Sequence, residues 1–168
     1  MDILKIATEW ARAEVFSSKF FIFFGILFVL GTIGFWQLGK TETAKAFIYP
    51  TLVSGILLLA VGIGILYANS TRVSSFATAY NEDATAFVKS EISRTEQSIG
   101  EYRTIVFKVI PVIIMVMSLI LIFVDKPIWR AICATTIAMM VVIILVDTNA
   151  NARLLEYRQH LEKVDKYD

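Results

Sequence analysis

The chain of 168 residues contains 57% hydrophobic and 18% charged residues, whereas a soluble domain has about 45–50% and about 25%. Its 16 basic and 15 acidic residues give a net charge of +1 and are mixed in sign along the sequence, which excludes the basic face of a nucleic-acid-binding protein. Cys133 and His160 each occur once, so we expect no intrachain disulfide, no zinc site and no cofactor.

Charged residues are spread through the first 19 positions instead of preceding a short apolar core, so no cleavable signal peptide is expected. The apolar residues of this segment recur at helical spacing: Ile3, Ile6, Ala7, Trp10 and Ala13. With Trp10 on its apolar face, the segment is predicted to be an amphipathic helix that lies in the membrane interface.

Four long apolar runs follow. They are Phe20 to Gly39 (20 residues), Ala46 to Thr71 (26), Val109 to Val124 (16) and Ala131 to Val146 (16). A membrane-spanning helix needs roughly 20 residues, so the last two runs are long enough only if Lys108 and Arg130 belong to the helices and extend toward the membrane surfaces. We therefore predict spans at about 20–38, 46–67, 105–124 and 128–146.

The connections between the spans are unequal. Those on one side are the short segment 39–45 and the turn at 125–127, whereas the 68–104 region and the tail 147–168 lie on the other side. Both of the longer segments read as helices, the first with Asp83 as N-cap. Their apolar stripes predict a helical bundle outside the membrane: Val88, Ile92, Thr95, Ile99 and Tyr102 in one, and Leu154, Tyr157, Leu161 and Val164 in the other.

Orientation follows from the distribution of lysine and arginine. The side with the two termini and the 68–104 region holds twelve of these residues, and the opposite side holds four, at Lys40, Lys45, Lys126 and Arg130. The positive-inside rule then places both termini and the long connection in the cytoplasm.

The spans carry no ionisable group near their middle except Cys133, and no catalytic motif occurs in the chain. The most notable polar residues gather at the cytoplasmic mouth. Lys108 enters the third span by about one turn and Asp147 leaves the fourth at a similar depth, which predicts an ion pair joined by Asn69, Arg72 or Asn149. The alternative is that Lys108 extends to lipid phosphates and Asp147 is simply solvated.

Small residues recur four positions apart on two spans, at Ala60, Gly64 and Ala68 and at Ala134 and Ala138. Such a face serves helix packing within the chain or, alternatively, packing against a partner in the membrane. Glu91, Glu96 and Glu101 alternate with Arg94 and Arg103, a pattern typical of a solvated helix.

Pro111 lacks a backbone donor and predicts a bend in the third span near Phe107.

These features predict one all-α membrane domain over residues 1–168: a four-helix transmembrane bundle with helical cytoplasmic extensions. In layout alone it resembles the four-span immunity proteins that protect bacteria from pore-forming toxins, although no motif residue carries the likeness. We expect a non-enzymatic inner-membrane protein that contacts the lipid bilayer and acts on a protein partner or as a homo-oligomer. The alternative is a small oligomeric channel or facilitator with its pore between protomers, lined by residues such as Ser54, Thr135 and Thr136.

Overall fold

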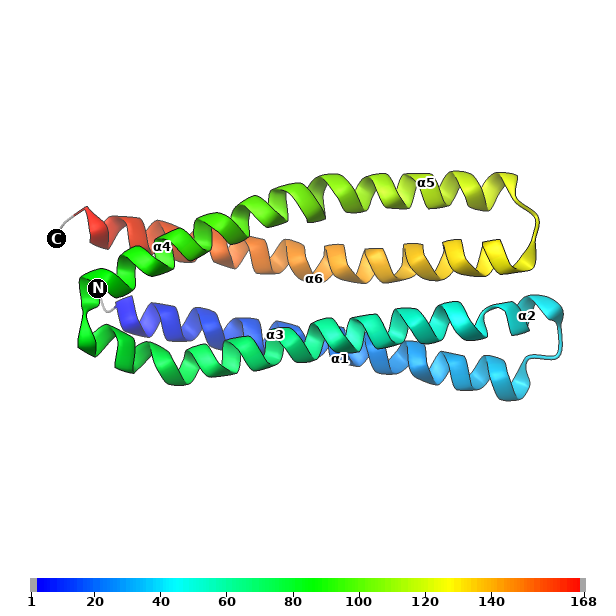
Figure 1. Cartoon of the computed structure of the whole chain (residues 1–168), viewed down its shortest axis with the longest axis horizontal. Helices are drawn as coiled ribbons and strands as arrows, with labels where there is room; N and C mark the ends of the chain where they lie inside the picture. Colours follow the sequence, from blue (N-terminus) through cyan, green and yellow to red (C-terminus); the bar gives the residue numbers. More distant parts are fainter. Residues whose placement is uncertain (1–2, 167–168) are drawn as a thin grey trace.

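Two antiparallel helical hairpins make up the described part of the chain, residues 3–166 of a computed structural model (Figure 1). The elements in order are α1 (Ile3–Leu38), α2 (Glu42–Ala46), α3 (Ile48–Glu82), α4 (Ala84–Glu101), the π-helix η1 (Tyr102–Val109), α5 (Ile110–Phe123) and α6 (Pro127–Asp165). This part contains no strand, so the predicted all-α class is confirmed. Residues 1–2 and 167–168, the ends of the predicted N-terminal segment and tail, lie outside the described residues.

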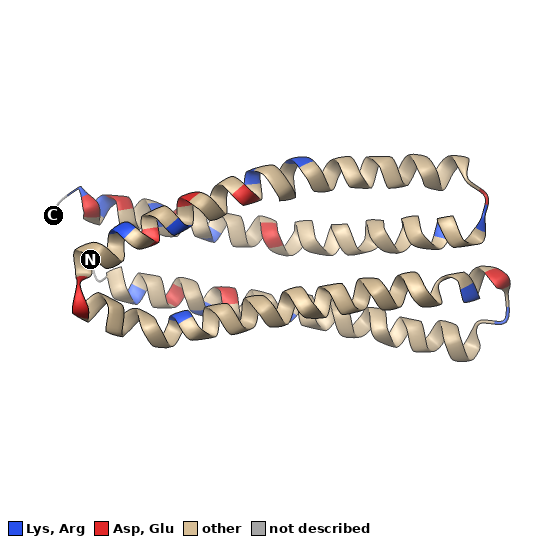
Figure 2. Ribbon diagram, viewed as in Figure 1, with Lys and Arg blue, Asp and Glu red and all other residues tan. Residues whose placement is uncertain are grey.

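Four continuous helical stretches are long and apolar enough to cross a membrane, as the sequence predicts. Each predicted span matches one of them: α1, α2 with α3, the rod formed by α4, η1 and α5, and α6, although the rod ends at Phe123, one residue before the predicted end of the third span. We call the end of the bundle where α1 begins, α3 meets α4 and α6 ends the charged end, and the opposite end the loop end. Figure 2 shows charged residues from the charged end to about the middle of the bundle and again at the loop end, with an uncharged stretch between them.

Local sequence explains where the helices begin and end. The predicted N-cap is confirmed: Asp83 separates α3 from α4, and its side chain accepts a 2.8 Å hydrogen bond from the backbone N–H of Ala86. Pro127 occupies the first turn of α6, where its missing N–H costs no helical hydrogen bond. At the end of α1, a Cβ on Gly39 would collide with the carbonyl oxygen of Phe35, so only glycine fits this turn.

The helices of the first hairpin approach closely at glycines. A Cβ on Gly62 of α3 would lie 2.8 Å from Ile22, and one on Gly25 of α1 would lie 2.7 Å from Leu59. Gly55 continues this face, since its Cβ would lie 3.1 Å from the carbonyl oxygen of Gly25. Direct backbone approach through small residues therefore joins α1 to α3.

This contact corrects the expectation that the predicted small-residue face packs within the chain; its alternative role against a partner stays a prediction. Ala60, Gly64 and Ala68 are exposed, and a Cβ on Gly64 would meet nothing within 4 Å. On α6, Ala138 is exposed and Ala134 is only partly buried. The packing face of α3 is offset by two residues, because the α1 helix meets the side that carries Gly55 and Gly62.

The prediction for the N-terminal segment is also corrected. It is the first part of the single helix α1 and not a separate helix in the membrane interface. Its apolar face is buried inside the protein, with Ala7 and Ala11 at 0% exposure and Trp10 at 8%. They belong to a hydrophobic core at the charged end that includes Phe76, Phe87, Val88, Leu154, Tyr157 and Leu161. The apolar stripes of α4 and α6 meet in this core, so the predicted helical bundle is confirmed.

The third long helix changes direction where the sequence predicts a bend (Figure 1). The structure produces the bend with the π-helix η1, in which the backbone N–H of Ile110 bonds to the carbonyl oxygen of Ile105, five residues back. The wider turn precedes Pro111, which has no N–H to offer. Beyond it, α5 packs only on α6 and η1 among the described elements, and Ile110 is its one buried residue.

Candidate functional site: a polar cavity at the charged end

A cavity of about 250 Å³ lies between the two hairpins, where α1, α3, α4 and α6 meet the start of η1. Its floor is apolar, with Phe21, Ile65 and Val146. Its walls carry charged and polar side chains from four helices: Glu14, Ser17, Asn69, Arg72, Arg94, Ser98 and Asp147. The hydrophobic core of the charged end lies on one side of it, and the spans lie on the other.

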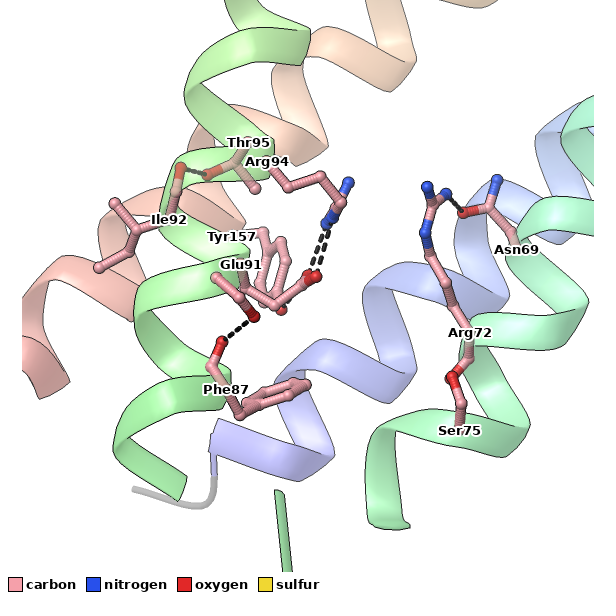
Figure 3. A network of polar contacts seen from close by, with 10 residues as sticks. Asn69, Arg72, Ser75, Phe87, Glu91, Ile92, Arg94, Thr95 and Tyr157 are labelled. Atoms are coloured by element: carbon pink, nitrogen blue, oxygen red, sulfur yellow. Dashed lines mark hydrogen bonds and ion pairs between the residues drawn. The ribbon is translucent and has the colours of Figure 1, made fainter. Parts of the chain in front are cut away.

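One wall is held by the carboxylate of Glu91, which is only 6% exposed. Arg94 donates to both of its oxygens, from Nε at 2.8 Å and from Nη2 at 2.6 Å. The Tyr157 hydroxyl of α6 adds a third hydrogen bond at 2.9 Å. Figure 3 shows this network beside the gap between α4 and α3. Burial and the nearby Glu91 carboxylate raise the pKa of Tyr157, so the hydroxyl keeps its proton and donates it.

Trp10 connects α1 to this network. Its ring stacks on Tyr157 with centroids 5.1 Å apart, and the Arg94 guanidinium lies 4.5 Å from the ring centroid. The Nε1–H of Trp10 is buried and has no acceptor within residues 3–166. Three helices thus meet at one aromatic side chain, which also lines the cavity.

A second buried pair joins α1 to α6. Arg153 donates to the Glu14 carboxylate at 2.9 Å and to the Ser17 hydroxyl at 2.7 Å. Glu14 is 6% exposed, so its charge is neutralised where it borders the cavity. The wall formed by α1 is therefore polar but close to neutral.

The wall formed by α3 has an unneutralised charge. Asn69 is 5% exposed, donates to the Ile65 carbonyl oxygen at 3.0 Å and accepts a 2.8 Å hydrogen bond from Nη1 of Arg72. Arg72 has no carboxylate partner among the described residues. Burial, and next the charge of Arg94, lower the pKa of Arg72, which agrees with two guanidinium groups facing one space (Figure 3).

Asp147 of α6 is the opposite case. It is partly buried and lines the cavity, and no hydrogen bond or ion pair reaches its carboxylate from the described part of the chain. The site therefore contains one unpaired cation and, in the same cavity, one carboxyl group without a partner among the described residues. Burial, and next the Glu14 carboxylate, raise the pKa of Asp147 to about 7, so this group loses its proton fully at neutral pH only when a cation lies beside it.

The structure brings together only part of the predicted polar cluster. Asn69, Arg72 and Asp147 share the cavity. Lys108 does not join them and forms no ion pair with Asp147: its side chain is exposed, because it lies about half a turn from Val106, which faces the bundle. Asn149 is exposed and bonds to the carbonyl oxygen of Leu145 in its own helix. The π-helical turn at η1, which the sequence analysis did not include, sets the register that directs Lys108 outward.

Other residues of the site were not predicted. Glu91 and Arg94 were expected on a solvated helix face, yet Glu91 is buried and its partners come from two elements. The three-residue spacing of Glu91 and Arg94 was a usable signal for their pairing. Nothing local connects Glu14 with Arg153, which lie 139 positions apart.

The side chains that line the cavity are suited to binding charged groups. Within residues 3–166, no three His, Cys, Asp or Glu side chains come together as ligands of a metal ion. Comparison with protein families, with curated proteins and with solved structures gave no match to this chain.

Proposed function

We propose that this is a non-enzymatic, multi-pass protein of the inner (cytoplasmic) membrane that acts through helix contacts with a protein partner. The charged end lies in the cytoplasm, in keeping with its excess of lysine and arginine. Immunity to a membrane toxin and an accessory role in a membrane assembly are two specific cases of such a function.

The observation that carries this proposal is the isolation of α5. Its contacts with the described residues are confined to α6 and η1, and only 11% of the most apolar window of the third span is buried, against 33% for the fourth. The outer face of α5 is wholly apolar and exposed, with Val112, Met115, Val116, Leu119 and Ile122. Such a face offers packing surface to another membrane helix. The exposed small residues Ala60 and Ala138 add places where a partner helix can approach closely.

The alternative, a channel between protomers, has less support. Two of the three residues expected to line its pore are buried inside the protomer, Ser54 at 4% and Thr135 at 6% exposure. Thr135 also donates its hydroxyl to the Ala131 carbonyl oxygen at 2.7 Å. A pore between protomers needs polar groups on the outer surface, and these hydroxyls face inward.

Photo-crosslinking in living cells tests the partner proposal. A photoreactive residue is placed at Met115 or Leu119 of α5, which are 57% and 50% exposed, and at Phe23 or Leu30 of α1, both 55% exposed, as matched controls. We expect one discrete protein adduct from the α5 positions and none from the α1 positions. Equal adducts from both helices, or lipid adducts alone, would contradict the proposal.

The oligomeric state and ion conductance of the purified protein distinguish the partner proposal from the channel alternative. The proposal expects a monomer in mild detergent and no selective ion current in planar bilayers. A stable oligomer that conducts ions selectively would establish the channel instead.

A further inference from the structure

The cavity at the charged end holds guanidinium groups and a carboxyl group that are not paired with one another, which suits one kind of ligand. Arg72 uses one of its N–H groups on Asn69 and keeps the others free, and Arg94 keeps Nη1 free of Glu91. Both guanidinium groups face the same space (Figure 3). Asp147 lines that space with no partner among residues 3–166. A ligand that carries both an anion and a cation would satisfy these groups together.

Unused hydrogen-bonding groups surround the same space. The hydroxyls of Ser98 and Tyr102 line the cavity and form no hydrogen bond with described residues. Trp10, which is 8% exposed, also lines the cavity, and its Nε1–H has no acceptor among the described residues. Buried polar groups are usually satisfied, so the buried N–H of Trp10, in a cavity that the half-buried Ser98 and Tyr102 also line, indicates a place for a polar ligand.

The size of the cavity limits the ligand. Its volume of about 250 Å³ is below the roughly 300–1,000 Å³ of pockets that enclose a drug-sized molecule. Gly64 and Ala68, exposed small residues of α3, form part of the wall and leave this space open. The cavity accommodates a headgroup but not a whole lipid.

A second cavity gives the first one an exit toward lipid. It measures about 240 Å³ and shares Ile65, Ser98, Tyr102 and Asp147 with the first. Its remaining wall is largely apolar, with Val61 of α3 and Ile105 and Val106 of η1, and it includes the exposed side chain of Glu101 at the end of α4. In the described chain α3 makes no contact with η1 or α5, so the two hairpins are open to the side here. A polar pocket thus continues into an apolar groove at the edge of the spans.

We propose that this cavity binds the phosphoethanolamine headgroup of a membrane lipid, with the phosphate between Arg72 and Arg94 and the ammonium group at Asp147. The acyl chains leave through the groove between α3 and η1. An ammonium group donates hydrogen bonds to a carboxylate, whereas choline cannot and is usually held by an aromatic cage. Trp10, Phe21 and Tyr102 line the cavity, but the Arg94 guanidinium already lies 4.5 Å from the centroid of the Trp10 ring. The inference does not depend on the proposed protein partner.

Native mass spectrometry of the full chain tests this with equal amounts of phosphatidylethanolamine, phosphatidylcholine and phosphatidylglycerol in detergent. The wild-type protein should retain one ethanolamine lipid, about tenfold tighter than the choline lipid. Arg72→Gln should weaken retention about tenfold, whereas Asp147→Asn should shift the preference to phosphatidylglycerol. Lys108→Gln, at a similar depth but outside the cavity, should retain the lipid as the wild type does.

Three results would overturn the proposal. The first is equal retention of the choline and ethanolamine lipids, or a preference of the wild type for phosphatidylglycerol, neither of which depends on the folding of a variant. The second is a loss in Lys108→Gln equal to that in Arg72→Gln. The third is displacement of the lipid by free phosphoethanolamine at the same concentration, which would assign the site to a soluble ligand.

Discussion

Buried charges at the charged end are satisfied residue by residue. Glu91 accepts three hydrogen bonds, two from Arg94 and one from Tyr157, while its own exposure is 6%. A carboxylate in such a place is tolerated only because every partner is present. The network joins α4 to α6 and, through the ring of Trp10, to α1. The arrangement of this cavity wall therefore depends on the side chain of Glu91.

Replacing Glu91 should be costly. Glu91→Ala leaves Arg94 and the Tyr157 hydroxyl without partners in a buried site, so we expect a loss of about 3–5 kcal/mol in the free energy of unfolding. The measurement is unfolding by SDS in mixed micelles, followed by circular dichroism.

The control for this substitution is Glu96→Ala, which removes the more exposed ion pair with Arg158. That change should cost about 0–1 kcal/mol. Equal losses in the two variants would show that Glu91 does not hold the helices together.

How much of the site was predictable depends on the range of the contacts. Asn69, Arg72 and Asp147 were found from the sequence because each follows the apolar end of a span, so their depth could be counted. Their partners could not be predicted, since the pairing of Glu14 with Arg153 needs the relative rotation of two helices far apart in sequence. The predicted ion pair between Lys108 and Asp147 was wrong for a related reason, because a π-helix changes the angle between successive residues.

At the level of elements, glycine spacing decides how α1 meets α3. The series Ala60, Gly64 and Ala68 looked like the packing face, yet Gly55 and Gly62 make the contact. Span positions and the N-cap at Asp83 were predictable because hydropathy and capping are local properties. Which of the two glycine-containing faces of α3 meets α1 is not a local property. It depends on how Ile22 of α1 packs at Gly62 and how Leu59 of α3 packs at Gly25.

A matched pair of substitutions tests this contact. In Gly62→Ala the new Cβ lies 2.8 Å from Ile22 and 2.9 Å from the Cβ of Phe21, so the helices must separate. We expect a loss of about 1–3 kcal/mol in stability, as overpacked sites show. Gly64→Ala, two residues on, meets nothing within 4 Å and should change stability by less than about 0.5 kcal/mol. The SDS unfolding midpoint reports both, and a larger effect at Gly64 would contradict the observed face.

For the molecule as a whole, two hairpins are joined most firmly at the charged end. One hydrophobic core lies there, and a second, smaller one of Phe21, Leu58, Met139 and Val142 joins the hairpins further along. Toward the loop end, and within residues 3–166, α5 contacts α6 and its junction with η1 and no other element. The hairpins also meet at the loop end, where α2 contacts α6. The cavity thus lies between the large core of the charged end and the smaller core further along the bundle.

Labelling of single cysteines in intact cells tests the central claim, a four-span protein with its charged end in the cytoplasm. In a Cys133→Ala background, Thr43→Cys places a thiol in α2 at the loop end, and Thr85→Cys places one at the charged end; both positions are exposed. A membrane-impermeant maleimide should label position 43 in intact cells and position 85 only after the membrane is opened. The reverse pattern would show that the protein has the opposite orientation in the membrane. Labelling of both positions in intact cells would contradict the four-span arrangement.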